Sequence, residues 1–312
     1  MAWYKKTGVG RGLRYLRRNW MLYAMILPGL IYIIIFKYFP MYGITIAFKD
    51  YNGISDISKA PWVGIANFTR LFSTRAFQRA LANNIIISVA KLLFGFPVPI
   101  LMALMIDSVR RKGMKRLVQT SVILPNFISW VVVYGLMYAI FSPSTGAVSQ
   151  LLRLLGYEGK LPDILSSKET FRSVIVGSHI WKSAGIGTIV YLAAITGIDQ
   201  QLYEAAAIDG AGRFRQMWHI TLTGIRTTII TLFIFRVGEV MYAGFDQIYA
   251  ISNDAVISVA DIIDTYVFRI GLEQRKFSLA TAAGLFQSLV GLVLVLITNK
   301  IAVKADPDSG IM

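Results

Sequence analysis

Apolar residues gather into six long stretches along the chain, with shorter polar connections between them. The stretches cover residues 20–48, 81–107, 117–141, 173–197, 226–250 and 277–301. Because about 20 apolar residues in an α-helix span the ~30 Å hydrocarbon core of a bilayer, each stretch is long enough to cross a membrane. The pattern predicts an all-α integral membrane protein, a six-span helical bundle in one transmembrane domain over residues 20–301.

The first apolar stretch also resembles a secretory signal peptide, because basic residues precede it. Its uninterrupted part, residues 21–36, is longer than the usual apolar core of a signal peptide, and it ends at Lys37 and Pro40 rather than at small residues. Apolar sequence then resumes as far as Phe48. We therefore expect this stretch to be a membrane span.

Basic residues are concentrated in two segments that flank the spans. Residues 1–19 carry six basic and no acidic side chains, and residues 110–116 carry five basic residues in seven. Lys and Arg accumulate in short cytoplasmic segments of membrane proteins. The rule places four segments in the cytoplasm: the basic N-terminal segment 1–19, the turn 110–116, the connection at about 198–225, and the tail 302–312. The connections 49–80, 142–172 and 251–276 then face outward.

The composition supports the membrane assignment and argues against nucleic-acid binding and metal sites. The chain is 55% hydrophobic and 16% charged, with a mean hydropathy of +0.57. Its net charge of +15 would suggest nucleic acid in a soluble protein, but membrane topology accounts for it here, and we expect no nucleic-acid partner. The chain has no cysteine, and its two histidines, His179 and His219, lie 40 residues apart. We expect no metal site.

The connection between the fourth and fifth spans has the pattern of two short helices. Asp199 can cap a first helix, residues 204–207 have high helix propensity, and residues 210–212 break it. On the second helix Phe214, Met217 and Trp218 share one face, which suits packing against the bundle. The alanine-rich first helix, with its carboxylates, suits a groove on another protein.

This segment resembles the EAA motif of binding-protein-dependent ABC importer permeases. The family pattern has EAA, three residues, Gly, nine residues and I-x-L-P, and the matching residues here are Glu204, Ala205, Ala206, Gly210, Ile220 and Leu222. The DGA form of carbohydrate permeases is matched by Asp209, Gly210 and Ala211, whereas Thr223 replaces the usual Pro. The resemblance assigns ATPase coupling to Glu204, Ala205, Ala206, Ala207, Asp209, Gly210 and Ala211.

The resemblance covers most of the chain and implies its fold, partners and location. It implies a type I ABC importer permease fold with a cytoplasmic coupling helix, in the bacterial cytoplasmic (inner) membrane. The implied partners are a second permease subunit, two ATPase subunits, an extracytoplasmic solute-binding protein, an oligosaccharide and membrane lipid. Residues 261–271 resemble the subgroup that imports alginate or rhamnogalacturonan fragments, which implies an acidic, alginate- or pectin-like substrate.

The chain itself is expected to be no enzyme. It contains no GxxxxGK[ST] motif, so the usual phosphate-binding loop is missing and ATP with Mg²⁺ belongs to the partner ATPase. We expect no cofactor in this chain. Its role would be to form half of the translocation path for the oligosaccharide.

Charged and aromatic residues within the spans are candidates for the substrate path. Charges are costly in a bilayer and are either functional or paired with one another. Aromatic rings suit the apolar faces of sugars, although packing and interfacial anchoring explain them equally well. The candidates are Lys91, Tyr134, Trp181, Arg236, Glu239, Tyr242 and Gln287. Arg236 and Glu239, three residues apart, can also pair locally.

Two other function classes compete with this interpretation. A membrane-embedded enzyme acting on lipid-linked sugars would need a cluster of acid, base or metal-binding residues, and the pattern shows none. A stand-alone secondary carrier would need an internal inverted repeat, which is not evident.

Overall fold

The computed structural model describes residues 15, 18–157, 159, 163–306 and 310. Within them the regular secondary structure is helical apart from an isolated bridge between Lys49 and Trp62, and turns and irregular segments connect the helices. The α-helices are α2 (Trp20–Ile33), α3 (Ala66–Ser73), α4 (Arg75–Gly95), α5 (Pro97–Asp107), α6 (Lys112–Ile123), α7 (Trp130–Phe141), α8 (Ala147–Leu154), α9 (Phe171–Thr196), α10 (Gln200–Ile208), α11 (Arg213–Gln216), α12 (Leu222–Gly224), α13 (Arg226–Gly238), α14 (Phe245–Ile251), α15 (Ile257–Ala260), α16 (Ile263–Phe268) and α17 (Phe277–Ala305). The short 3₁₀ and π segments are η1 (Ile34–Tyr38), η2 (Phe39–Phe48), η3 (Leu124–Phe127), η4 (Met217–Thr221), η5 (Glu239–Met241) and η6 (Arg269–Glu273).

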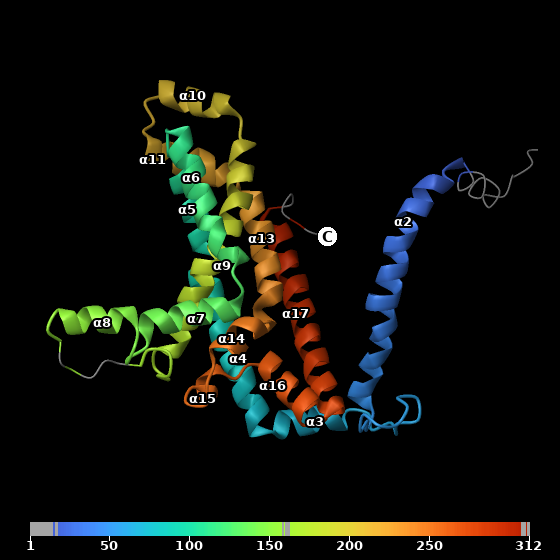
Figure 1. Ribbon diagram of the computed structural model, residues 1–312. Coiled ribbons are helices and arrows are strands. Elements are labelled where there is room, and N and C mark those ends of the chain that lie inside the picture. The colour runs from blue at the N-terminus through green and yellow to red at the C-terminus, as the bar shows by residue number, and fades with distance from the viewer. Residues whose placement is uncertain (1–14, 16–17, 158, 160–162, 307–309, 311–312) are drawn as a thin grey trace, which may run out of the picture.

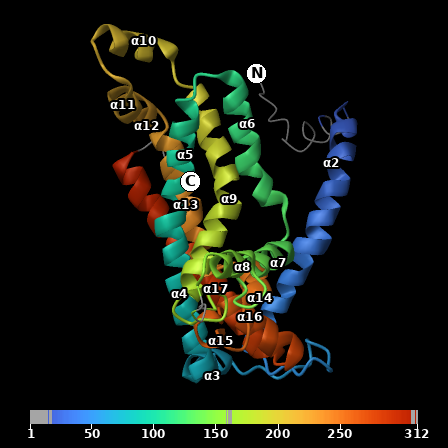
Figure 2. The same ribbon diagram turned by 60° about the vertical axis from the view of Figure 1, so that its left-hand side comes forward.

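The helices α4, α5, α9, α13 and α17 form an elongated bundle (Figure 1). One end carries α10, α11 and the connection between α5 and α6, and the opposite end carries α3, α15 and α16 (Figures 1 and 2). The basic turn 110–116 and the EAA segment therefore share one end of the bundle. The connections 49–80 and 251–276 share the other end.

Three segments are continuous helical spans, and three more are bent. Trp20–Phe48, Arg75–Asp107 and Phe277–Lys304 are each long and apolar enough to cross a membrane. The bent pairs Lys112–Phe127 with Trp130–Phe141, Phe171–Thr196 with Gln200–Ile208, and Arg213–Gly224 with Arg226–Met241 raise the number to six. The predicted all-α, six-span architecture is confirmed, although several boundaries differ from those expected.

The third predicted span, residues 117–141, is not one straight helix. Its two halves meet at 103°, and α7 turns sideways from the bundle with α8 beyond it (Figure 1). Pro125 lies in the 3₁₀ segment η3, and the Ser129 hydroxyl then accepts a hydrogen bond from the Val132 amide to cap α7. Proline disfavours helix in the preceding residue and lacks an amide donor, so the bend follows from the local sequence.

The fifth predicted span, residues 226–250, is interrupted. α13 and η5 end at Met241, residues 242–244 are not helical, and α14 begins at Phe245. Gly244 has a φ of +97°, in a region that favours glycine. Of the three residues in the break, Ala243 is buried, whereas Tyr242 and Gly244 are exposed.

Small residues let the helices of the bundle approach closely. A Cβ atom on Gly185 of α9 would lie 1.9 Å from the carbonyl oxygen of Val122 in α6. A Cβ atom on Gly238 of α13 would lie 2.3 Å from a methyl group of Val295 in α17. Close backbone contact of this kind replaces the hydrophobic effect as the source of helix association inside a bilayer.

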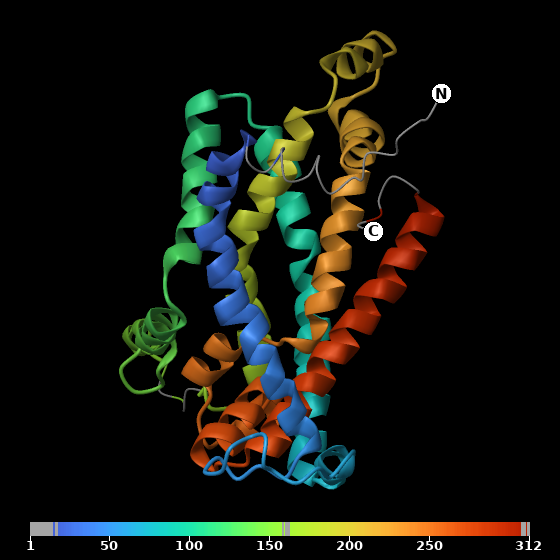
Figure 3. The ribbon, with the colours of Figure 1, turned by 90° about the vertical axis from the view of Figure 1, so that its right-hand side faces the viewer.

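The first helix stands apart from the bundle. No residue of α2 is buried, and its continuation η2 contacts the outer end of α17 (Figures 1 and 3). Most of the predicted N-terminal segment 1–19 lies outside the described residues. Of the predicted tail 302–312, the residues to 305 continue α17, and residues 307–309 and 311–312 lie outside the described residues.

Candidate functional site

The EAA segment folds as a short helix that ends in a glycine turn. The Asp199 carboxylate caps α10 by accepting a hydrogen bond from the Gln201 amide at 3.0 Å. At the other end Ala211 N donates to Ala206 O at 2.8 Å and Gly210 N donates to Ala207 O at 3.1 Å. These two bonds make a Schellman turn, which needs a residue with positive φ, and Gly210 has a φ of +75°. The predicted helix, cap and break are confirmed.

Most of the surface of α10 is exposed. Among the described residues, Tyr203 is the side chain on it that has a hydrogen-bond partner, the Thr221 hydroxyl at 2.9 Å. Glu204, Ala205 and Ala207 are exposed, Ala206 is half-buried, and Ile208 is 87% exposed. Among the described residues, neither the Glu204 carboxylate nor the Asp209 carboxylate has a hydrogen bond or an ion pair. An exposed apolar side chain and two carboxylates without partners among the described residues therefore stand at the tip of the molecule.

The short second helix packs differently from the prediction. Met217 contacts the bundle, beside the buried cluster that includes Leu192 and Ile225. Phe214 and Trp218 remain 73% and 58% exposed and stack on each other, with ring centroids 6.4 Å apart. The expectation that all three pack against the bundle is therefore wrong for Phe214 and Trp218, which share a face with each other, and right for Met217 at the start of the π segment η4.

The break after η5 is held together by long polar side chains from other helices. Asn84 of α4 donates to Met241 O at 3.0 Å, and Gln287 of α17 donates to the same carbonyl at 2.6 Å. The Lys91 ammonium donates to Ala243 O at 2.6 Å. A helix that stops inside a bilayer frees carbonyl groups, and no water is available there to satisfy them. These side chains replace the missing helical donors.

A cavity of about 270 Å³ opens beside this break. It is bounded by α4, α5, α9, α13 and the non-helical residues 242–244. Four of the predicted path residues line it together, namely Lys91, Arg236, Glu239 and Tyr242. The polar residues Ser88, His179 and Ser183 also line it, although they are not among the predicted path residues.

Three predicted path residues lie outside the cavity lining. Tyr134 on α7 packs beside the buried cluster around Phe171 and Ile248. Trp181 on α9 is 50% exposed on the flank of the bundle. Gln287 is buried, and its amide nitrogen donates to Met241 O at 2.6 Å and to the Asp264 carboxylate at 2.9 Å, which occupies both of its donors.

The charges in the cavity are not equivalent. Lys91 donates to Gln247 Oε1 at 2.5 Å as well as to Ala243 O, so two of its three donors are occupied by the fold. Among the residues that the structure describes, Arg236 is bound only by Glu239, at 3.1 Å, and both side chains are about half exposed or more. Lys182, also within a span, donates to Asn126 O away from the cavity. Arg236 is therefore the cavity cation that can exchange its partner.

Ser88 adds an unused polar group to the same cavity. Its side chain is 5% exposed, and its hydroxyl oxygen has no hydrogen-bond partner among the described residues. Buried hydroxyl groups are normally paired, and an unpaired one is costly. The residue was missed because an isolated Ser in an apolar helix carries no pattern that distinguishes it from packing.

The described residues contain no group of three or more His, Asp or Glu side chains placed to hold a metal ion. The cavity has one carboxylate, Glu239, and that carboxylate is paired with Arg236. The arrangement has the properties of a passage with exchangeable charge rather than of a hydrolytic centre.

Comparison with known proteins agrees with the geometry. The family described as "Binding-protein-dependent transport system inner membrane component" matches residues 95–307. Protein LplB of Bacillus subtilis is 44% identical over 302 residues, which cover 96% of this chain and 94% of that protein. The polygalacturonan/rhamnogalacturonan transport system permease protein YteP of the same organism is 44% identical over 301 residues, 96% of this chain and 93% of that protein.

Two solved structures share the fold over nearly the whole chain. One belongs to a bacterial ABC transporter involved in the import of the acidic polysaccharide alginate, with a TM-score of 0.87, 42% identity, and coverage of 95% of this chain and 99% of that one. The other shows a bacterial alginate ABC transporter in complex with an alginate pentasaccharide-bound periplasmic protein. Its TM-score is 0.85 at 42% identity, covering 94% of this chain and 97% of that one.

Proposed function

The chain belongs to the family of binding-protein-dependent transport system inner membrane components, and on that premise we propose that it forms half of the import path for an acidic oligosaccharide. As an ABC permease subunit it is not itself an enzyme, and it is a multi-pass protein of the inner membrane. Membership of this family argues against both alternative functions, an enzyme acting on lipid-linked sugars and a stand-alone secondary carrier.

The cavity beside the helix break supports an acidic substrate. Arg236 is held there by one exchangeable ion pair with Glu239, so a uronate carboxylate can take the place of Glu239 at the guanidinium. Tyr242 lines the same space, and its hydroxyl, 3.1 Å from the Ser288 hydroxyl, can exchange that partner for a sugar hydroxyl group. The relatives whose names mention polygalacturonan and alginate support the same substrate class.

The proposed second permease subunit and ATPase subunits can each be assigned to an exposed surface of this chain. A second permease subunit would cover the exposed apolar surface of α2 and complete the passage. Two ATPase subunits would dock on the EAA segments of the two permease subunits. In this chain the coupling surface on and after α10 would consist of Glu204, Ala205, Ala206, Ala207, Asp209, Gly210 and Ala211. In this arrangement the end that carries α10, with both chain termini, lies in the cytoplasm, which agrees with the basic residues at 110–116. Closure of the ATPase pair would then rock the bundle around the cavity.

The test is substrate-stimulated ATPase activity of the full complex in nanodiscs, with the binding protein present. Uronate oligomers and neutral oligomers of equal length are compared. We expect Arg236→Gln to reduce the preference for uronates by about 10-fold or more, because it removes a charge-assisted hydrogen bond. Glu239→Gln, which leaves Arg236 unpaired, should keep or increase the preference.

Lys182→Gln is the matched control, because it removes a positive charge within a span but outside the cavity. Stimulation by neutral sugars alone would contradict the proposed substrate class. An unchanged uronate preference in Arg236→Gln would remove Arg236 from the substrate path.

A further inference from the structure

The connection between α9 and α13 has two halves of opposite charge. Residues 199–212, which include α10, carry three acidic side chains and no basic one. Residues 213–224, which include α11, η4 and α12, carry Arg213, Arg215 and His219 and no acidic side chain. The acidic half suits a basic partner, whereas the basic half suits an anion.

The basic half lies where the bundle leaves the hydrocarbon region. Met217 of η4 packs beside a buried cluster that includes Ala103 and Ile106, in the last turn of α5. Directly after α5 comes the basic turn 110–116. Because such basic turns lie among the lipid headgroups, α11 and η4 stand at headgroup level. α10 lies farther from the bundle than α11 (Figures 1 and 2).

Two stacked aromatic rings are exposed at this level. Phe214 is 73% exposed and Trp218 is 58% exposed. Among the described residues, the Trp218 indole nitrogen has no hydrogen-bond partner. Tryptophan is enriched at membrane interfaces, because its ring can contact the acyl chains while its N–H donates to the headgroups. The pair therefore has the properties of an interfacial anchor.

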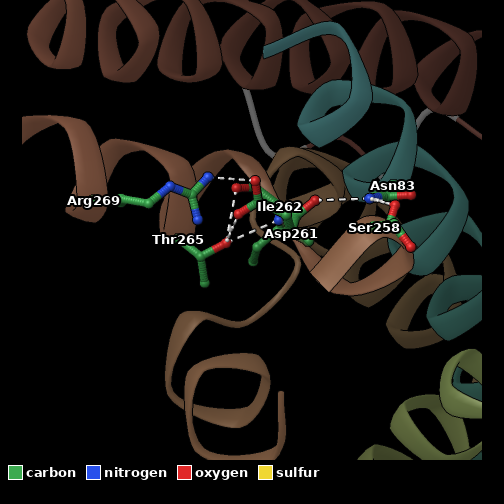
Figure 4. Close-up of polar contacts among 6 residues, drawn as sticks. All are labelled: Asn83, Ser258, Asp261, Ile262, Thr265 and Arg269. Carbon is green, nitrogen blue, oxygen red and sulfur yellow. Dashed lines mark hydrogen bonds and ion pairs between the residues drawn. The ribbon is translucent and has the colours of Figure 1, made fainter. Parts of the chain in front are cut away.

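Arg213 and Arg215, on either side of Phe214 in the sequence, are exposed. Among the residues that the structure describes, neither guanidinium makes a hydrogen bond or an ion pair. By contrast, Arg269 at the opposite end of the bundle is bound to the buried Asp261 carboxylate, within the polar cluster of Figure 4. A guanidinium without a partner offers a planar set of donors that matches the oxygens of a phosphate.

The basic half is tied to α10 by side-chain hydrogen bonds. The Tyr203 hydroxyl of α10 lies 2.9 Å from the hydroxyl of Thr221 in η4, and Thr221 is 4% exposed. The Gln216 amide of α11 donates to Ala211 O, in the turn after α10, at 3.0 Å. The two halves therefore form one unit, so a ligand that holds α11 and η4 also holds α10.

We propose that Arg213, Arg215 and the stacked pair of Phe214 and Trp218 bind an anionic phospholipid in the leaflet at this end of the bundle. The phosphate lies at the guanidinium groups, and the rings lie beside the upper acyl chains. A lipid is favoured over the ATPase as the occupant because this surface is basic and aromatic at headgroup level, whereas the carboxylates that suit a basic protein groove lie on and next to α10.

The bound lipid gives α10 a fixed point against the membrane. Closure of the ATPase pair then moves the bundle instead of displacing the connection alone. This effect on coupling rests on the proposed function, because it needs an ATPase at α10. The lipid site itself rests only on the position and chemistry of the basic half.

The first measurement places a fluorophore beside the site, in the complete transporter in nanodiscs. The chain has no cysteine, so His219→Cys, at an exposed position next to Trp218, takes the label once the cysteines of the partner subunits are replaced. Quenching by phosphatidylglycerol brominated in the upper acyl chain is compared with quenching by equally brominated phosphatidylcholine. We expect stronger quenching by phosphatidylglycerol. The same label on Ala207→Cys, an exposed position of α10, should be quenched little by either lipid.

The test variant combines Arg213→Gln with Arg215→Gln. Each arginine near an anionic membrane surface contributes roughly five-fold to binding, so the preference for phosphatidylglycerol at residue 219 should fall about 10-fold or more. The matched control, Arg110→Gln with Arg111→Gln, removes the same charge from exposed positions of the basic turn and should keep the preference. Both variants should melt at the wild-type temperature. An unchanged preference in the test variant, or an equal loss in both variants, would overturn the proposal.

The second measurement is the ATPase activity of the complex as the phosphatidylglycerol content of the nanodiscs is raised. The wild type and the control should be stimulated, and the test variant should lose most of the stimulation because lipid no longer holds α10. Stimulation that persists in the test variant would mean that the lipid has no part in coupling, and that step would fail.

Two further arms separate other occupants of this surface. If the test variant keeps the lipid quenching but loses its ATPase subunits during purification, the surface belongs to the ATPase and the proposal fails. If inorganic phosphate reproduces the stimulation in phosphatidylcholine nanodiscs, the site takes a free anion and the lipid proposal fails. Uronate preference, measured at one lipid composition, reports on the proposed function separately because it depends on Arg236 in the cavity.

Discussion

Two of the places where the chain interrupts its helices differ in how the backbone is satisfied: the glycine turn after α10 and the break after η5. In the turn after α10 the backbone satisfies itself through the Schellman bonds of Gly210 and Ala211, and the nearby side chains are left unpaired. In the break after η5 the backbone cannot satisfy itself, and Asn84, Lys91 and Gln287 supply the donors. The first interruption faces water or a partner, and the second lies at membrane depth.

The comparison shows how similar residue types take on different roles. A charged or amide side chain at the helix break is first of all a replacement for lost helical hydrogen bonds. Only Arg236 and Glu239, whose pair stays half exposed in the cavity, remain free to exchange partners. The carboxylates of Glu204 and Asp209, near the end of α10, do not replace any helical hydrogen bond, so they remain available to bind another protein.

The largest effect should come from removing a donor at the break. Lys91→Met would leave Ala243 O and Gln247 Oε1 unpaired in a buried site, and we expect a loss of about 2–5 kcal/mol of stability. Thermal melting of the purified complex measures it. Lys112→Met, at an exposed position of the basic turn, is the control and should change stability little. Equal melting of both variants would mean that the break does not depend on the lysine.

A smaller effect on stability and a larger one on coupling are expected from Gly210→Val. The position has room for a side chain, but its φ of +75° would cost a β-branched residue about 1–2 kcal/mol. We expect uptake to fall while insertion and melting stay close to wild type. A cross-link between Ala207→Cys and a cysteine in the ATPase groove, in this cysteine-free chain, should weaken in parallel.

The control for this variant is Gly212→Ala, because Gly212 has a negative φ and open space around it. It should keep both uptake and the cross-link. Loss of uptake in Gly212→Ala as well would show that any side chain in the turn is harmful, whatever the backbone conformation.

The smallest effect concerns Asp264, which joins the outer connection to Gln287. Burial raises the pKa of its carboxyl above the ordinary 3.8, and the hydrogen bond from Gln287 opposes this. The folded chain therefore holds this proton more tightly than the unfolded chain. Protonated Asp264 stabilises the folded state, and this contribution to folding stability is lost as pH rises through the raised pKa.

Asp264→Asn keeps an acceptor for Gln287 without the charge. It should raise the melting temperature near neutral pH by no more than about 2–4 °C, and the gain should shrink as pH falls toward 4. Asp246→Asn, at an exposed position of α14, is the control. A gain that is independent of pH would contradict the titration of Asp264 as its cause.

The amino-acid sequence by itself determined the features that depend on local chemistry. Apolar length marked the six spans, Asp199 marked the cap of α10, and Gly210 marked its end, because each signal involves residues within a few positions of one another. The spacing from Glu204 to Leu222 was likewise sufficient to indicate the family. The charged candidates Lys91, Arg236 and Glu239 could be selected from the sequence because a charge within a span is costly unless it is functional or paired.

Only the tertiary structure decided which of those residues hold the fold and which remain free. Lys91 meets Ala243 across 152 positions of the chain, and Gln287 meets Met241 across 46, so no pattern along the sequence could show that they replace broken helical bonds. The break itself is hidden in the sequence because its residues are as apolar as a helix would require. Ser88, with its unpaired hydroxyl in the cavity, is recognisable only after the packing of α4, α9 and α13 has excluded every other partner among the described residues.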